Sequence, residues 1–153
     1  MLALKLLAVF LMGAAVGILY RVPRSLLLYG SLNAMLAWLA MYGFAGYGGN
    51  AIGANFCGGL MVGLVAELLA RLLRKPATIF VIPGFIPLVP GREAFMTMRF
   101  FVEREYSQAV AMGVQTLFIA GAIAFGIFVS VTVYRLILTY QKKESGIGYA
   151  DKG

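Results

Sequence analysis

The sequence predicts an all-α integral membrane protein with about five transmembrane helices, the fourth of them broken by proline and glycine, and a short amphipathic helix. Of the 153 residues, 61% are hydrophobic and 12% are charged, whereas soluble domains carry about 25% charged residues. The apolar residues form long stretches close to the ~20 residues with which a helix crosses a bilayer. Charged residues gather at the ends of these stretches, as loop charges do in membrane proteins. Residues 1–141 are therefore expected to form one transmembrane domain, and residues 142–153 a polar cytoplasmic tail.

The first two apolar stretches are expected to be complete transmembrane helices. Leu2 to Tyr20 is interrupted only by Lys5 and ends at the basic, proline-containing run 21–24. A cleaved signal peptide is the alternative for this stretch, but its length and its arginine-rich end favour a retained helix. The second stretch, Leu26 to Phe44, gives way to the turn-forming run 45–50.

The third stretch and the last one each read as a span that ends in basic residues. The third runs from about Ile52 to Leu73 and stops at the run 74–76. Glu67 and Arg71 lie four residues apart near its basic end, so they are expected to pair on one helix face. The alternative for an acid inside a span is a functional role. The last span covers about residues 108–138.

The fourth segment, residues 77–89, is too short and too rich in proline for an ordinary span. Each proline lacks an N–H donor and clashes with the carbonyl four residues back, which excludes a continuous helix through Pro83, Pro87 and Pro90. The side chains between them are apolar. Unwound backbone at membrane depth is tolerated only where it is buried in protein or lines a wet cavity. Broken helices of this kind form the substrate and ion sites of many secondary transporters.

Residues 91–106 are expected to form the amphipathic helix, whose beginning suits an anion. The exposed amides and positive dipole at Pro90-Gly91, together with Arg92, would favour a carboxylate. The alternative is a kinked span whose carbonyls are satisfied by neighbouring helices, and residues 77–90 could either cross fully or re-enter. We expect the substrate or translocation path to be lined by Pro83, Gly84, Pro87, Pro90, Gly91 and Arg92.

Small residues recur at four-residue intervals inside the spans and are expected to bring helices close together. The pairs are Gly13 and Gly17, Gly59 and Gly63, and Ala122 and Gly126. Packing within the chain is the favoured interpretation, and a subunit interface, hence an oligomer, is the alternative. No internal sequence repeat is found.

The distribution of basic residues predicts the orientation in the membrane. With five spans, nine of the 13 Lys and Arg residues fall on one side and four on the other. The richer side is expected to be cytoplasmic. The N-terminus would then lie outside and the C-terminus in the cytoplasm.

Several functional classes are disfavoured by what the sequence lacks. It has no histidine, and Cys57 is its one cysteine, so the usual general base and the usual metal ligands are missing. No Walker-type phosphate loop occurs. The net charge of +7 does not form a run or a face, which argues against nucleic acid. We therefore expect no enzyme activity, no cofactor and no metal.

The run Ile82-Pro-Gly-Phe-Ile-Pro-Leu-Val-Pro-Gly91 resembles the signature of the threonine/serine exporter family. The match is to the second half of the family, which in some bacteria is a separate small membrane subunit. The basic turns at 21–24 and 75–76 fall where that half has similar turns. The resemblance implies that Pro83, Gly84, Pro87, Pro90 and Gly91 are signature positions.

The resemblance also implies a function and a partner. The family's substrates are small polar metabolites, threonine and serine in some members and dicarboxylates in others. Because the sequence lacks the family's first half, a larger membrane subunit is expected as its partner. We thus expect a subunit of a secondary exporter in the cell inner membrane. The alternative is a non-transporting assembly or scaffold subunit, which would not need the broken segment.

Overall fold

The computed structural model describes residues 2–147 of the chain. Within this range the chain forms six α-helices and one 3₁₀ turn: α1 (Leu2–Leu19), α2 (Arg24–Gly46), α3 (Ala51–Leu72), α4 (Thr78–Phe85), η1 (Ile86–Leu88), α5 (Gly91–Val102) and α6 (Tyr106–Ile147). No strand occurs among the described residues. The predicted all-α fold is therefore confirmed.

Four helices are long and apolar enough to cross a membrane: α1, α2, α3 and the part of α6 from Tyr106 to Ile137. The segment from Thr78 to Leu88 and the helix α5 make a fifth candidate span, bent by 49° at the break between them. The predicted amphipathic helix is thus the second half of this candidate span. The helix α6 continues to Ile147. The predicted tail 142–153 otherwise lies outside the described residues and stays a prediction.

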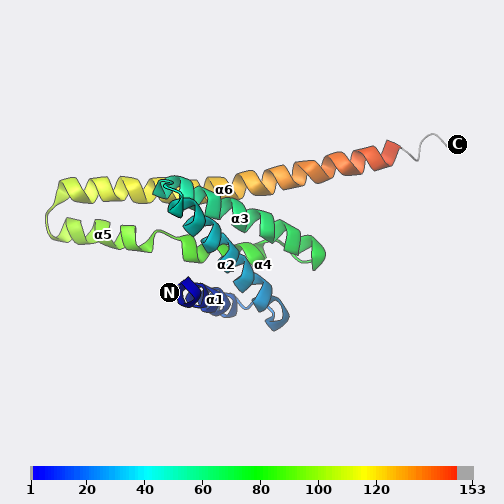
Figure 1. Ribbon diagram of the computed structural model, residues 1–153, viewed down its shortest axis with the longest axis horizontal. Coiled ribbons are helices and arrows are strands. Elements are labelled where there is room, and N and C mark those ends of the chain that lie inside the picture. The colour runs from blue at the N-terminus through cyan, green and yellow to red at the C-terminus, as the bar shows by residue number, and fades with distance from the viewer. Residues whose placement is uncertain (1, 148–153) are drawn as a thin grey trace.

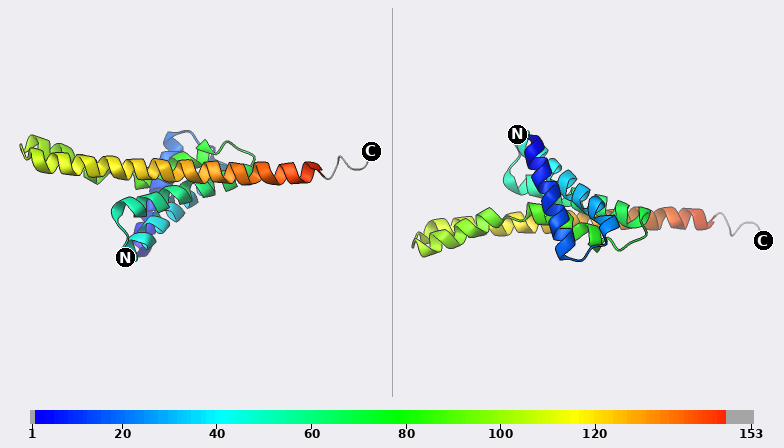
Figure 2. Two further views of the ribbon diagram at one scale, coloured as in Figure 1. Left: turned by 90° about the horizontal axis from the view of Figure 1, so that it is seen from above. Right: turned by 90° about the horizontal axis from the view of Figure 1, so that it is seen from below.

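The helix α6 is the longest element, and α3 and α5 pack along it (Figure 1). α3 lies beside its middle, whereas α5 folds back along its beginning. α1, α2 and α4 contact one another, α2 and α4 also contact α3, and α1 and α2 cross the direction of α6 (Figure 2). α3 and α6 run parallel, because contacts advance along both helices from Phe56–Phe125 to Glu67–Arg135.

Glycines bring α3 and α6 into backbone contact. A Cβ atom added at Gly59 would lie 2.5 Å from the Ile123 carbonyl oxygen, and one at Gly126 would lie 2.5 Å from the Phe56 carbonyl oxygen. A Cβ at Gly63 would collide with the hydroxyl of Ser130. Close approach of this kind replaces the hydrophobic drive that lipid does not supply. The prediction that these small residues pack helices within the chain is confirmed.

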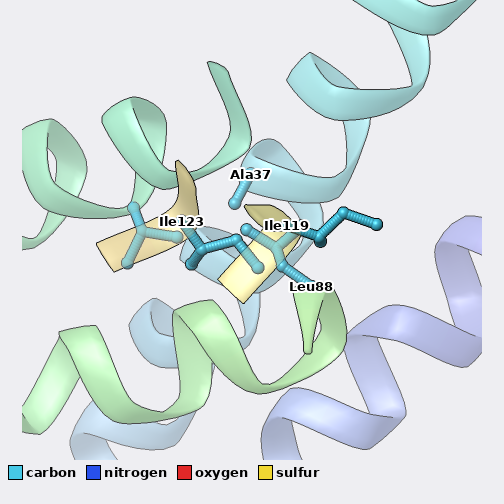
Figure 3. Close-up of a cluster of buried hydrophobic side chains, with 5 residues drawn as sticks. Ala37, Leu88, Ile119 and Ile123 are labelled. Atoms are coloured by element: carbon cyan, nitrogen blue, oxygen red, sulfur yellow. The ribbon is translucent and has the colours of Figure 1, made fainter. Parts of the chain in front are cut away.

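Two hydrophobic clusters connect the helices at different heights of the bundle. The first joins α2, α3, η1 and α6 through Ala37, Val62, Leu88, Ile119 and Ile123. Figure 3 shows Leu88 reaching toward Ala37, Ile119 and Ile123. The second joins α2, α3 and α4 through Leu26, Ala66, Ala70 and Phe80. The segment formed by α4 and η1 therefore contributes to both clusters.

Four helix ends share one backbone geometry, the Schellman motif. The residue after the helix has a positive φ, and the following N–H donates to a carbonyl five residues earlier, as from Val22 to Gly17 (2.9 Å). Glycine adopts this backbone freely, whereas a residue with a side chain pays about 1–2 kcal/mol. The positive-φ residues are Arg21 (56°), Gly48 (83°), Arg74 (51°) and Arg104 (64°). Arginine thus occupies three positions that favour glycine.

Basic residues divide between the two ends of the bundle. Val22 and Leu73, which adjoin Arg21 and Arg74, pack against the same cluster beneath the α1–α2 and α3–α4 turns. Arg135 joins this end through its bond to α3. The basic residues there are Arg21, Arg24, Arg71, Arg74, Lys75 and Arg135. At the opposite end, the Lys5 ammonium lies 5.4 Å from the centre of the Tyr42 ring.

Candidate functional site

The break in the fourth span lies beyond Pro83. Helix α4 passes through Pro83 and ends at Phe85, after which η1 tightens the chain over Ile86–Leu88. Pro90 then adopts φ −75° and ψ 58°, and the Gly91 N–H donates to the Val89 carbonyl at 2.7 Å. This is an inverse γ-turn. The helical path is therefore interrupted between Pro87 and Pro90, where the prolines follow one another most closely.

Asn33 of α2 links the broken segment to the rest of the bundle. Its side chain is fully buried. The Nδ2 amide donates to the Phe80 carbonyl of α4 at 3.0 Å and to the Val62 carbonyl of α3 at 3.3 Å. Asn33 is not among the predicted site residues, although an amide inside an apolar span is a signal that could identify it. Its Oδ1 atom has no hydrogen-bond partner among the described residues.

Gly84 packs directly against this amide, and Pro83 packs against Gly30 of the same helix α2. A Cβ atom added at Gly84 would lie 2.7 Å from Asn33 Nδ2 and 3.1 Å from Val62 Cγ1. A Cβ at Gly30 of α2 would lie 2.8 Å from Pro83 Cγ. Glycine at both positions lets α4 approach α2 closely enough for the amide to reach the α4 backbone. Of the six predicted site residues, Gly84 thus meets Asn33, and Pro83 lies against α2 at Gly30.

The remaining predicted site residues lie elsewhere along the segment. Pro87 is partly buried in η1. Pro90 borders an apolar groove of about 280 Å³ between the broken segment and α6, lined also by Val81, Phe85 and Ile123. Gly91 and Arg92 are exposed at the start of α5. Their part in a translocation path stays a prediction.

Arg92 lies in a second groove and does not line the groove that Pro90 borders. This groove of about 230 Å³ between α5 and α6 is lined by Arg92, Glu93, Met96, Met112 and Gln115. Glu93 occupies the first turn of α5, where its carboxylate already complements the positive helix end. The structure therefore separates three of the predicted residues: Gly84 at the Asn33 contact, Pro90 at the apolar groove and Arg92 in the α5–α6 groove.

The predicted pair of Glu67 with Arg71 is wrong. The Arg135 Nε of α6 donates to Glu67 Oε1 at 3.0 Å, and Glu67 is 4% exposed. The Arg71 guanidinium instead lies 5.2 Å from the centre of the Tyr134 ring, a cation–π distance. The close α3–α6 contact brings Arg135 nearer to Glu67 than the next turn of α3 does. No three metal-ligating side chains come together in the part of the chain that the structure describes.

The comparisons with known proteins give one result. No curated protein and no solved structure matches this chain. A family model described as the threonine/serine exporter, ThrE, matches residues 5–133. This range includes the broken span, Asn33 and Glu67, and it covers well over half of the chain. The chain therefore belongs to the threonine/serine exporter family, and it is a multi-pass membrane protein of a transporter family.

Proposed function

We propose that this chain is the small membrane subunit of a secondary exporter in the cell inner membrane. Its substrates are small polar metabolites, namely amino acids such as threonine and serine or small dicarboxylates. It works with a larger membrane subunit of the same family. The observation that carries the proposal is the interrupted fourth span, which is joined to the bundle through the Asn33 amide.

The position of the interruption supports a translocation role. Leu88 belongs to the same cluster as Val62 and Ile123, so the unwound backbone lies within the apolar part of the bundle. Because Pro83 has no N–H, the carbonyl of Ile79 loses its helical donor. Secondary transporters use such carbonyls and half-helix ends to contact solutes and ions. Two grooves flank the interruption and give a solute room to approach.

A partner subunit is proposed because alternating access needs two bundles that move around one site. This chain supplies one bundle of four or five spans, and its sequence contains no repeat that could supply the second. The apolar groove between α4 and α6 is open on one side of the bundle. The larger subunit would complete the path there.

The orientation proposed for the subunit follows from its charges. Six basic residues lie at the end of the bundle that carries the α1–α2 and α3–α4 turns: Arg21, Arg24, Arg71, Arg74, Lys75 and Arg135. Short basic loops stay in the cytoplasm. The N-terminus is accordingly proposed to lie outside and the C-terminus inside.

Export measurements test the proposal directly. Threonine, serine and succinate efflux should be measured in cells that express this chain with the larger subunit, with either alone, and with neither. Efflux that needs both subunits is expected. Full efflux from this chain in cells without the larger subunit would contradict the proposed need for a partner. No efflux from the pair would contradict the proposed export function.

A cysteine scan tests the path within the subunit. Positions 85 to 92 are replaced singly in a Cys57→Ala background and treated with a membrane-impermeant thiol reagent. Labelling at several positions, reduced by substrate, is expected. Arg92→Ala should weaken carboxylate export more than Arg99→Ala, because Arg99 is bonded to Glu103 at 2.8 Å, away from the start of α5. Uniform protection with normal export would leave only a structural kink.

A further inference from the structure

We propose that the end of the bundle formed by the α1–α2 and α3–α4 turns binds an anionic phospholipid of the surrounding leaflet, with Arg21 and Arg74 as its principal contacts. Figure 1 shows these two turns next to each other, and Val22 and Leu73 pack against one cluster beneath them. The four turn residues Arg21, Arg24, Arg74 and Lys75 are all exposed. A positively charged surface is thus assembled from two separate parts of the chain.

Little negative charge offsets this surface within the protein. Among the side chains that the structure describes, Glu67 is the one acid at this end, and it is buried in its bond to Arg135. The other described acids, Glu93, Glu103 and Glu105, lie in or beside α5. Among the described side chains, no exposed acid supplies a counter-charge for the turns.

Arginine stands at these turns in a backbone conformation that favours glycine. Arg21 and Arg74 both have the left-handed backbone of a Schellman motif, with φ of 56° and 51°. Glycine fits that position without strain, and it occupies the corresponding position, Gly48, after α2. An arginine there bears a conformational cost that the helix end itself does not repay. Unlike Arg104, which has the same backbone, neither Arg21 nor Arg74 has an acidic neighbour in the sequence.

The surroundings of the arginines identify the ligand as a lipid and not as a free phosphate. Leu19 and Tyr20, directly before Arg21, are 78% and 55% exposed, and Leu72, two residues before Arg74, is 70% exposed. An anion bound at the turns therefore adjoins apolar side chains that need acyl chains around them. A phospholipid offers both parts, since guanidinium groups pair with its phosphate and the helix side chains meet its tails.

Arg104 provides a matched control. It has the same left-handed Schellman geometry, with φ of 64°, but it lies after α5 between Glu103 and Glu105. Changing any of these arginines to glycine removes a charge while keeping a residue that suits the backbone. The substitutions should therefore leave the helix ends intact.

The experiment measures phospholipid retention by the purified full chain in detergent, by native mass spectrometry. The wild-type chain is expected to retain phosphatidylglycerol in preference to phosphatidylcholine. Arg21→Gly and Arg74→Gly should each lower phosphatidylglycerol binding about fivefold, on the basis of the usual contribution of one basic residue at an anionic surface. Arg104→Gly should leave binding unchanged. Without lipid, the glycine variants should unfold at a temperature no lower than that of the wild type.

Additional measurements keep the proposal open to refutation if a glycine variant folds poorly. The double variant Arg24→Gln/Lys75→Gln alters neither left-handed residue and should also lower phosphatidylglycerol binding. Equal binding of the two lipids by the wild type would overturn the proposal, as would unchanged binding in all the variants at these turns. It would also be overturned if Arg104→Gly lost as much binding as Arg21→Gly, or if soluble glycerol phosphate displaced the lipid completely.

Discussion

Replacing Gly84 with alanine should destabilise the protein, whereas the same change at Gly121 should not. Both glycines lie in helices, Gly84 in α4 and Gly121 in α6. They differ in what a methyl group would meet. At Gly84 the new Cβ would lie 2.7 Å from Asn33 Nδ2 and 3.1 Å from Val62 Cγ1, and at Gly121 nothing lies within 4 Å.

The magnitude follows from three contributions. Overpacking a well-filled core costs about 1–3 kcal/mol. If the amide of Asn33 moves aside, its bond to Phe80 is weakened, and a polar contact between membrane helices contributes about 0.6 kcal/mol and at most about 1.7 kcal/mol. Alanine favours a helix over glycine by about 1 kcal/mol. The net loss at Gly84 is therefore about 1–3 kcal/mol, while Gly121→Ala should gain up to about 1 kcal/mol.

The free energy of unfolding can be compared for both variants by titrating the detergent-solubilised protein with SDS and following the loss of helix. Export by the two variants provides a second readout, in which Gly84→Ala is expected to be impaired and Gly121→Ala normal. Equal stability of the two variants would refute the reasoning, because it would mean that Asn33 does not hold α4 at the distance described.

Three other predictions concern the polar contacts and the orientation. Asn33→Ala should lower the free energy of unfolding in SDS by about 1 kcal/mol more than Ser31→Ala does. The Ser31 hydroxyl donates only within its own helix, to the carbonyl four residues earlier, and so joins no other helix. Arg135→Ala should lower the free energy of unfolding by about 1–3 kcal/mol, because it leaves the buried Glu67 without its exposed partner. Adding Glu67→Gln should recover part of that loss, and no recovery would contradict the pairing. A C-terminal reporter that is active only in the periplasm should be inactive, and its activity would reverse the proposed orientation.

The spans could be predicted because their apolar composition is determined by the surrounding lipid and not by contacts with the rest of the chain. The runs that form α1, α2 and α3 are apolar on nearly every side, so their identity did not depend on which helix they contact. The interruption near Pro87 and Pro90 was predictable for a similarly local reason, since proline removes a donor wherever it stands.

The polar contacts could not be predicted, because their partners are distant in sequence. Glu67 bonds to a residue 68 positions away, and sequence spacing shows only its neighbours on α3. Asn33 likewise reaches Phe80 across 47 positions. The sequence also did not indicate that α4 continues through Pro83, because this depends on the packing of α2 and α3 around α4. The six predicted site residues share a segment, but the bend at Pro90 distributes them over separate surfaces.

The length of α6 has a mechanical consequence. Its apolar part, Tyr106–Ile137, has 32 residues, or about 48 Å against a hydrocarbon layer of ~30 Å. α3 packs against the middle of α6. The first dozen residues of α6 therefore extend beyond α3 by about 18 Å, with α5 packed beside them. Rocking α6 by about 10° at the α3 contact would swing the tip of that extension by about 3 Å. α4 packs against α1, α2 and α3, whereas α5 packs against α6. If α6 rocked, α5 would move with it and α4 would not, so the backbone angles at the Pro90 turn would have to change.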